Sequence, residues 1–196
     1  ATPAAGQAVV AVNTTTKRIQ TVDGAGFKRT LGYVNFSTAA QTITTARTYI
    51  TGSNILIPAG ALQVGTMFKW TFDITKTAAG TAAAIYDIAF GTAGTTADTA
   101  RVSFTKPAGT AAVDCGRVEI TAVVRGPIGA TGVVAGHFEM THNLAATGHA
   151  LIACVNVTTV SAAFDVTAPT NIGLCLTGGA SDSVTIQLVQ TEAWNF

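Results

Sequence analysis

The feature that most constrains the fold is an alternation of apolar and polar residues over several short windows. The clearest windows are 67–74, 118–125 and 184–189. Period-two patterns of this kind place successive side chains on opposite faces of a β-strand. We therefore expect antiparallel strands that bury one face and expose the other to water.

The same pattern predicts which side chains form the core. In the window 67–74 we expect Phe68, Trp70 and Phe72 to be the core anchors. In the window 184–189 we expect Val184, Ile186 and Leu188 to be buried. Further candidate strands lie at 85–90, 101–105, 133–141, 150–158 and 171–176.

Segments rich in Gly and Pro separate these windows, as at 107–109, 126–129 and 178–182. Such residues interrupt strands, and no window of a dozen residues carries a helical stripe of apolar side chains. The strand windows that follow residue 42 predict an all-β fold, with an antiparallel β-sandwich or jelly roll over residues 42–196.

The composition agrees with this fold and excludes several classes of function. The chain has 35 Ala, 34 Thr and 20 Gly residues, and its 48% apolar and 11% charged residues exclude a disordered chain. A net charge of +1 cannot neutralise many phosphates, so we expect no nucleic-acid partner. No window reaches the roughly 18 apolar residues of a membrane span, and residues 1–6 do not resemble a signal peptide. We therefore expect a protein made in the cytoplasm with no membrane partner.

Residues 1–35 differ from the rest and predict a small N-terminal β-meander. Short strands at 8–13, 18–22 and 27–34 are joined by polar or Gly-rich turns. A ribbon of two or three strands is marginal by itself. We expect it to dock on the main domain, on other copies or on a larger assembly, with a boundary near residues 36–42.

The chain has three cysteines, Cys115, Cys154 and Cys175, with no C-x-x-C spacing. An odd and sparse set predicts three buried thiols in a reducing cytosol. An intermolecular disulfide at any of them stays open, because spacing cannot establish disulfide geometry.

A short N-terminal string is similar to a known family. Residues 12–26, VNTTTKRIQTVDGAG, resemble a module of tailed-bacteriophage structural proteins, whose usual form is V-D-S-T-T-K-x-L-x-x-x-D-x-A-G. Asn13 replaces the usual acidic residue without disturbing the strand pattern. The stretches 47–70, 76–83, 91–98, 142–148 and 192–196 fit the same family of virion β-domains.

The resemblance implies a virion surface component, either a head decoration or head-fibre protein or part of a tail fibre. Such proteins are often homotrimers that attach by an N-terminal segment. The implied partners are other copies of the chain and the major capsid protein or another virion protein. A tail-fibre role would add a host-cell surface glycan, for which we expect the loops 91–99 and 126–132 to form the site.

Few residue clusters could carry chemistry. His137 and Glu139 share a strand face, but a metal site needs at least three convergent ligands, and His142 and His149 lack a zinc-type spacing to that pair. Glu119 and Glu139 could lie on neighbouring strands with outward carboxylates, the pair that a glycosidase requires. Nothing near them in the sequence supplies an aromatic platform for a sugar.

Nucleophilic and phosphate-binding motifs are also missing from the sequence. No serine lies in a G-x-S-x-G motif, and the apolar run around Cys154 predicts an inert thiol. The Gly-rich segment 91–94 lacks the Lys and the following helix of a phosphate loop. We therefore predict no catalytic residue, no cofactor, no metal and no enzymatic activity.

The remaining interpretation is a protein that works by binding. We predict a capsid decoration or head-fibre protein bound to the particle as a homo-oligomer, in which three-fold packing would bury sheet edges. A tail-fibre or receptor-binding component is the first alternative, and a carbohydrate-active enzyme that uses Glu119 and Glu139 is the second. Trp194 and Phe196 are the candidate interface aromatics, with burial in a C-terminal strand as the alternative.

Overall fold

The computed structural model describes residues 4, 8–13, 18–23, 28–30, 32–58, 60–169, 171–181 and 184–196. These residues form fifteen β-strands and no helix, which confirms the predicted all-β class. No helix able to cross a membrane occurs in the described ranges. The expected turns at 14–17 and 24–26 lie outside the described residues.

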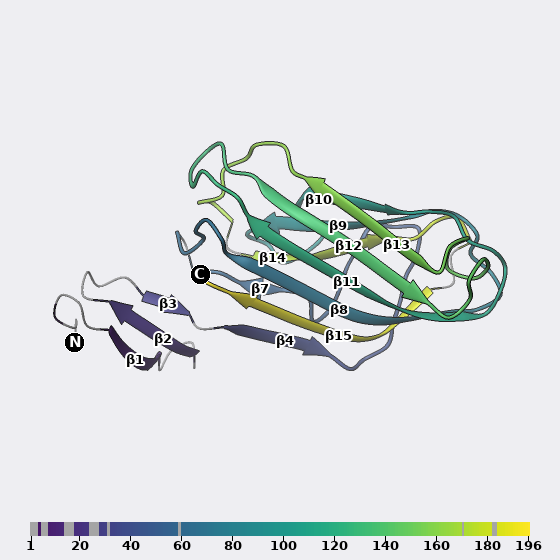
Figure 1. Ribbon diagram of the computed structural model, residues 1–196, viewed down its shortest axis with the longest axis horizontal. Coiled ribbons are helices and arrows are strands. Elements are labelled where there is room, and N and C mark those ends of the chain that lie inside the picture. Colours follow the sequence, from purple (N-terminus) through teal and green to yellow (C-terminus); the bar gives the residue numbers. More distant parts are fainter. Residues whose placement is uncertain are drawn as a thin grey trace.

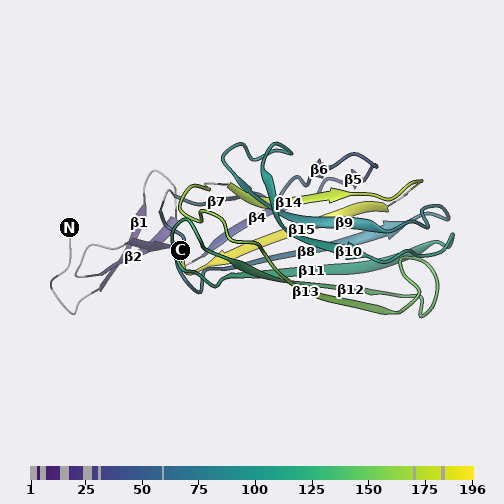
Figure 2. The same ribbon diagram turned by 90° about the horizontal axis from the view of Figure 1, so that it is seen from above.

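The first three strands form a small antiparallel sheet, which we call the N-terminal sheet. It consists of β1 (Ala8–Asn13), β2 (Arg18–Asp23) and β3 (Lys28–Thr30), with β2 in the middle. Figures 1 and 2 place it beyond one end of the main body, next to the C-terminus. We call this the near end of the body and the opposite one the far end.

The larger sheet of the main body has the strand order β13, β12, β11, β8, β15, β4, and the short β5 also pairs with β15 (Figure 1). All its pairings are antiparallel. Its strands are β4 (Tyr33–Ser37), β5 (Gln41–Thr42), β8 (Met67–Lys76), β11 (Asp114–Val124), β12 (Val134–His142), β13 (Cys154–Val160) and β15 (Val184–Trp194).

The smaller sheet has the order β10, β9, β14, β6, with β7 also paired to β14. Its strands are β6 (Thr48–Tyr49), β7 (Ile55–Leu56), β9 (Ala84–Gly91), β10 (Thr99–Lys106) and β14 (Asn171–Thr177). The two sheets lie face to face as layers (Figure 2).

The chain passes repeatedly between these two layers. From β8 in the larger sheet it crosses to β9 and β10, returns for β11 to β13, crosses again for β14 and ends in β15. This is a β-sandwich of the jelly-roll kind, as the sequence predicts. The hairpin of β12 and β13 widens the larger sheet at one edge.

The core fills the space between the sheets. Phe68 and Trp70 are 0% exposed and Phe72 is 1% exposed, and ring contacts join β8 to Tyr86 and Phe90 of the opposite sheet. The Trp70 indole N–H donates a hydrogen bond of 2.8 Å to the carbonyl oxygen of Ser53. The face that alternation assigned to the interior in β8 is therefore the face that packs against the second sheet.

The larger sheet begins earlier in the chain than expected. Instead of one strand over 27–34, the structure has β3 and then β4, and β4 pairs with β15 over Tyr33–Ser37. Residues 33–35 of the expected N-terminal unit thus belong to the sandwich, because their partner strand is the last strand of the chain.

A β-bulge changes the facing of β15. The register with β8 shifts between Ile186 and Leu188. A bulge inserts one extra residue, which reverses the facing of the residues that follow. Val189 is consequently buried and Leu188 half-buried, so the expectation that Leu188 continues the buried face is wrong.

Candidate interaction surface

Figure 1 shows the larger sheet in front. The registers of its strands place the outward side chains in rows that run across the strands. Residues directly opposite each other on paired strands share one face and lie about 5 Å apart at Cβ. The registers therefore show which side chains meet on this face. Rows in the middle are polar, and the row at the near end is apolar.

The middle rows enclose a shallow hollow of about 240 Å³, which we call the polar hollow. It is lined by Lys69, Thr71, Arg117, Glu119, Gln190 and Glu192. Lys69 Nζ lies 2.7 Å from Glu119 Oε2, and Arg117 Nε lies 2.9 Å from Asp73 Oδ1. The hydrogen bond from Arg117 to Asp73 raises the pKa of the guanidinium. Because these pairs are largely exposed, they contribute little to stability.

The structure confirms that Glu119 and Glu139 are neighbours. They lie directly opposite each other on β11 and β12, and His137 shares their face, with Nδ1 3.1 Å from the Thr158 hydroxyl. Both carboxylates are half-buried on an open sheet face. A glycosidase keeps its general acid protonated by burial in an apolar pocket, and no such pocket surrounds either carboxylate in the described structure. The pair offers hydrogen-bond acceptors.

An apolar row crosses the same face at the near end. Its members, in register across five strands, are Val160, Ala135, Val123, Met67 and Trp194. Met67 is 47% exposed and Trp194, directly opposite, is 36% exposed. Val160 at the other end of the row is 46% exposed, whereas Ala135 is 8% exposed and Val123 is half-buried. The contiguous exposed part of the row is thus the Met67 and Trp194 pair, and contiguous exposed apolar side chains mark interaction sites more strongly than scattered ones. The apolar row is therefore a candidate contact surface.

The structure separates the two candidate interface aromatics. Trp194 ends the apolar row on the surface, whereas Phe196 is 2% exposed and belongs to the core of its own chain. The Phe196 ring is thus covered by its own chain, which agrees with the alternative that the C-terminal segment is buried.

The N-terminal sheet lies open next to this row. Val9 and Val10 of β1 are 45% and 66% exposed. Successive residues of a strand point to opposite faces, so neither face of β1 is covered at this position. A small three-stranded sheet is marginally stable by itself.

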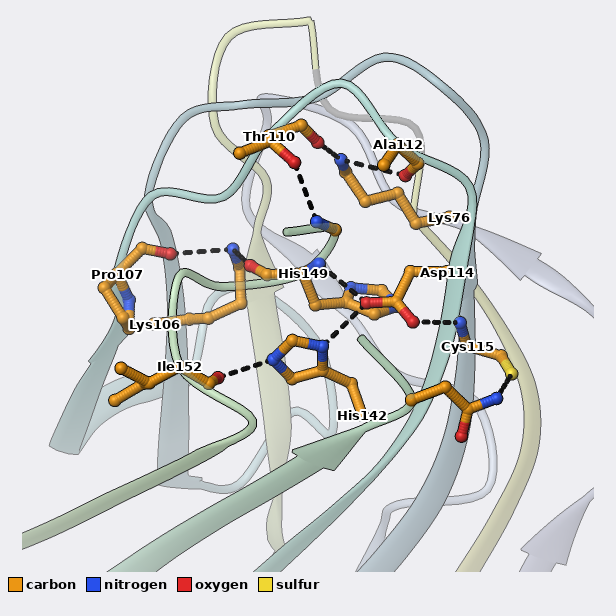
Figure 3. Close-up of polar contacts among 12 residues, drawn as sticks. Lys76, Lys106, Pro107, Thr110, Ala112, Asp114, Cys115, His142, His149 and Ile152 are labelled. Carbon is orange, nitrogen blue, oxygen red and sulfur yellow. Dashed lines mark hydrogen bonds and ion pairs between the residues drawn. The ribbon is translucent and has the colours of Figure 1, made fainter. Parts of the chain in front are cut away.

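At the far end, titratable side chains lie buried close together (Figure 3). We call them the far-end cluster: Lys76, Lys106, Asp114, His142 and His149. The first four are between 2% and 8% exposed and His149 is 0% exposed. Ionised groups at this depth need partners, because desolvation of an unpaired charge costs several kcal/mol.

Asp114 and His142 are the centre of the far-end cluster. Asp114 Oδ2 lies 2.7 Å from His142 Nδ1 and accepts the backbone N–H of His149 at 2.9 Å. His142 Nε2 lies 2.6 Å from the carbonyl oxygen of Ile152. Both ring nitrogens of His142 thus face acceptor oxygens of the same chain. Burial opposes the ionisation of Asp114, but the hydrogen bonds from His149 and His142 outweigh it and lower its pKa.

The lysines and His149 complete the cluster. Lys106 Nζ donates to the carbonyl oxygens of Pro107 and His149 at 2.9 and 2.8 Å, and Lys76 Nζ donates to the carbonyl of Thr110. Within the described residues, the ring nitrogens of His149 have no hydrogen-bond partner. Burial lowers the pKa of His149 to about 4, so its ring is neutral at neutral pH.

The prediction of three buried thiols is wrong for two of them. Cys115 and Cys154 are exposed and Cys175 is buried, and all three are free. Cys154 begins β13 with its side chain on the outward face, so the apolar run before it belongs to a loop and not to the core. Burial raises the pKa of the Cys175 thiol to about 12.

Cys115 lies beside His142 in a surface hollow of about 460 Å³. A thiol nucleophile needs a neighbouring base with a free nitrogen. Both ring nitrogens of His142 already contact Asp114 and Ile152, so this histidine is not placed to serve Cys115. The described residues also include no group of three or more His, Cys, Asp or Glu side chains that could hold a metal ion.

The loop 91–99, expected as a glycan site, borders a hollow of about 380 Å³. The Asp98 carboxylate holds the loop by accepting the N–H groups of Ala93 and Gly94 at 2.9 and 2.8 Å. Two aromatic residues line the hollow, Phe90 and Phe164, and they are 3% and 5% exposed. Their rings are covered, so this hollow offers a sugar no open aromatic face.

Sequence reasoning missed the far-end cluster, although a signal for it exists. Lys76 follows Ile74, and Lys106 follows Phe104, at the inward position of the alternation. Asp114 and His142 likewise lie in step with the buried residues of β11 and β12. Reading the period-two pattern one step further along each strand would have placed all four charges inside.

No protein-family model matches this chain, and no curated protein matches its sequence. Several solved structures have a weak structural similarity to this chain. The VP2 subviral particle of infectious bursal disease virus aligns over 97% of this chain and 38% of that chain, with 14% identity and a TM-score of 0.34. The CBM2 module of the evolved Dit of Lactobacillus casei BL23 phage J-1 covers 73% of this chain and 69% of the module, with 12% identity and a TM-score of 0.30.

A lectin-like defense protein of Phaseolus vulgaris, arcelin-5, aligns over 95% of this chain and 90% of its own, with 8% identity and a TM-score of 0.40. Structural neighbours thus include a viral capsid protein and a phage module as well as a plant protein. All three TM-scores are below 0.5, so these likenesses carry no argument about function.

Proposed function

We propose that this chain is a structural component of a phage virion, a capsid decoration or head-fibre protein that binds the particle surface as a homo-oligomer. The observation that carries the proposal is the near end, where exposed Met67 and Trp194 of the apolar row lie on the same side of the body as exposed Val9 and Val10 of the N-terminal sheet. The N-terminal sheet is the attachment element, and the major capsid protein or another virion protein is its partner.

A partner that covers the apolar side chains of the near end lowers the free energy of the complex. Burial of apolar surface stabilises a complex by about 25 cal/mol for each Å². Many identical copies on a particle also turn weak single contacts into a firm attachment. A homotrimer is one closed arrangement in which copies would share such a surface.

The test compares two truncations of the chain. Deletion of residues 1–31 removes the N-terminal sheet and keeps β4, whereas deletion of residues 1–37 also removes β4 from its pairing with β15. We expect the first variant to stay folded and oligomeric but to lose binding to particles assembled without the protein. We expect the second to lose thermal stability as well.

Normal incorporation of the 1–31 deletion into particles would contradict the attachment role. Electron microscopy of labelled particles gives a second readout, because label on the head supports the decoration role. Label on the tail fibres would favour the receptor-binding alternative, with a host-cell surface glycan as its partner.

A further inference from the structure

Phe36 and the polar hollow form a surface that attachment to a particle does not require. We propose that the polar hollow binds a neutral oligosaccharide, with Phe36 as the ring on which one sugar stacks. This site goes beyond the virion role proposed above and does not depend on it.

Phe36 lies at the border of the hollow with its side chain open. It is 66% exposed and lies directly opposite Gln190, one of the lining residues. Neighbouring Asn35 holds this edge of the sheet, because its amide donates to the carbonyl oxygen of Asn54 at 2.9 Å and its Oδ1 accepts the Phe36 N–H at 2.9 Å. The ring is thus held on a rigid strand beside polar groups, as ligand sites require.

The hollow also presents polar groups that the protein does not use. Among the described residues, no side chain bonds to the amide of Gln190, the carboxylate of Glu192 or the hydroxyl of Thr71. An amide both donates and accepts, and a carboxylate accepts from two oxygens. Together they match the hydroxyl groups on the edge of a sugar ring, while Phe36 covers its apolar face.

Charge selects a neutral sugar. Both cations of the hollow are occupied, Lys69 by Glu119 and Arg117 by Asp73. Two carboxylates have no ionic partner in the described structure. They are Glu192, which lines the hollow, and Glu139, which lies directly opposite Glu119. The free charges are therefore negative and would repel the carboxylates or sulfates of acidic polysaccharides.

A second copy of this chain fits the hollow less well than a sugar. All six lining side chains are polar, and burial against a protein face would strip water from the free groups without replacing every hydrogen bond. A sugar supplies a hydroxyl for each of them. The apolar row, one step along the sheet, is the better surface for protein contact.

The test uses the purified full chain in affinity electrophoresis through gels that contain soluble polymers. The neutral probes are polymers of glucose, mannose and galactose, and the acidic probe is alginate. We expect at least one neutral polymer to retard the chain and alginate to leave it unretarded. Phe36→Ala should weaken retardation about fivefold to tenfold, which is the worth of one aromatic contact, and Gln190→Ala should also weaken it.

Two further variants are the controls. Phe36→Tyr keeps the ring and should keep binding. Val113→Ala removes an equally exposed apolar side chain that is 71% exposed in a loop at the far end, and it should bind like the parent. Melting curves establish that each variant is folded.

The proposal is overturned if no neutral polymer retards the chain, if alginate retards it more strongly, or if Phe36→Ala binds as the parent does. Sedimentation of the same variants gives one more contrary outcome. If Phe36→Ala converts an oligomer into monomers, the occupant of this face is a second copy and not a sugar.

Discussion

The two ends of the sandwich differ in where the side chains at the strand ends lie. At the far end, Lys76, Lys106, Asp114 and His142 turn inward and bond to each other or to loop carbonyls. At the near end, the apolar row turns outward beside the N-terminal sheet.

The two ends therefore differ in what holds their side chains. The buried polar groups of the far end depend on hydrogen bonds within the same chain. Met67 and Trp194 at the near end remain in water, and their burial against the proposed partner would add stability that the isolated chain lacks.

The largest expected effect lies in the core that both ends share. Trp70→Ala should lower the free energy of unfolding by about 3–5 kcal/mol because it opens a cavity and leaves the Ser53 carbonyl without its donor. Urea unfolding measures this, and Trp70→Phe is the milder control. A Trp70→Ala variant that unfolds like the parent would show that the core assignment is wrong.

The next largest effect is expected at the far end. Asp114→Ala leaves the His142 ring and the His149 N–H buried without their acceptor. Removal of one partner from a buried ion pair should lower stability by about 3 kcal/mol. Glu139→Ala is the matched control on the outward face, where we expect a change within about 0.5 kcal/mol. If both variants lose the same amount of stability, burial of Asp114 in the far-end cluster contributes no more than an outward carboxylate does, and the prediction is wrong.

Acid should weaken the far end before it affects the near end. Burial holds the pKa of His149 at about 4, below its ordinary value of 6.5, with Asp114, Lys106, His142 and Lys76 around it. As pH falls from 6.5 to 4, the unfolded chain binds a proton on His149 that the folded chain does not bind. Stability therefore falls over this interval. Below it, Asp114, whose pKa is lowered, adds a further loss as its carboxylate becomes protonated.

Thermal unfolding between pH 7 and pH 4 measures this effect, and His149→Gln should flatten the curve. A direct check is the NMR titration of the His149 ring in the folded parent. A midpoint near 6.5 would contradict the buried, neutral ring.

The alternation of apolar and polar residues predicts most strands of the sandwich and their buried faces. It does not predict where the strands become irregular. In β8 every inward position of the alternation is buried, and in β11 every inward position except Gly116 is buried, because nothing interrupts their ladders. In β15 the bulge after Ile186 places Val189, and not Leu188, on the buried face. No residue type at this position predicts the bulge. A pattern read from one strand contains no information about an extra residue relative to its partner.

Long-range pairing explains the other differences. Residues 33–37 joined the larger sheet because their partner, β15, lies at the other end of the chain. Cys154 became exposed because its strand starts at that residue, and the apolar residues Leu151 and Ile152 before it are themselves exposed in a loop. The Glu119 and Glu139 pair was predictable, since both lie on outward positions of strands that follow one another.

The smallest expected change in stability is at the near end. Met67→Ser and Trp194→Ser alter side chains that are 47% and 36% exposed. Substitutions at exposed positions usually change stability by no more than about 0.5 kcal/mol.

Binding to particles should nonetheless fall for the Met67→Ser and Trp194→Ser double variant, because the apolar row loses its two adjacent exposed side chains, Met67 and Trp194. Val113→Ser and Leu151→Ser form the matched control, since these side chains are 71% and 58% exposed at the far end. They lie in separate loop positions and not in a row across paired strands, so particle binding should be unchanged. If both double variants lose binding equally, exposed apolar area matters wherever it lies, and the near end has no special role. If only the near-end variant loses binding while both melt like the parent, the apolar row acts in contact and not in folding.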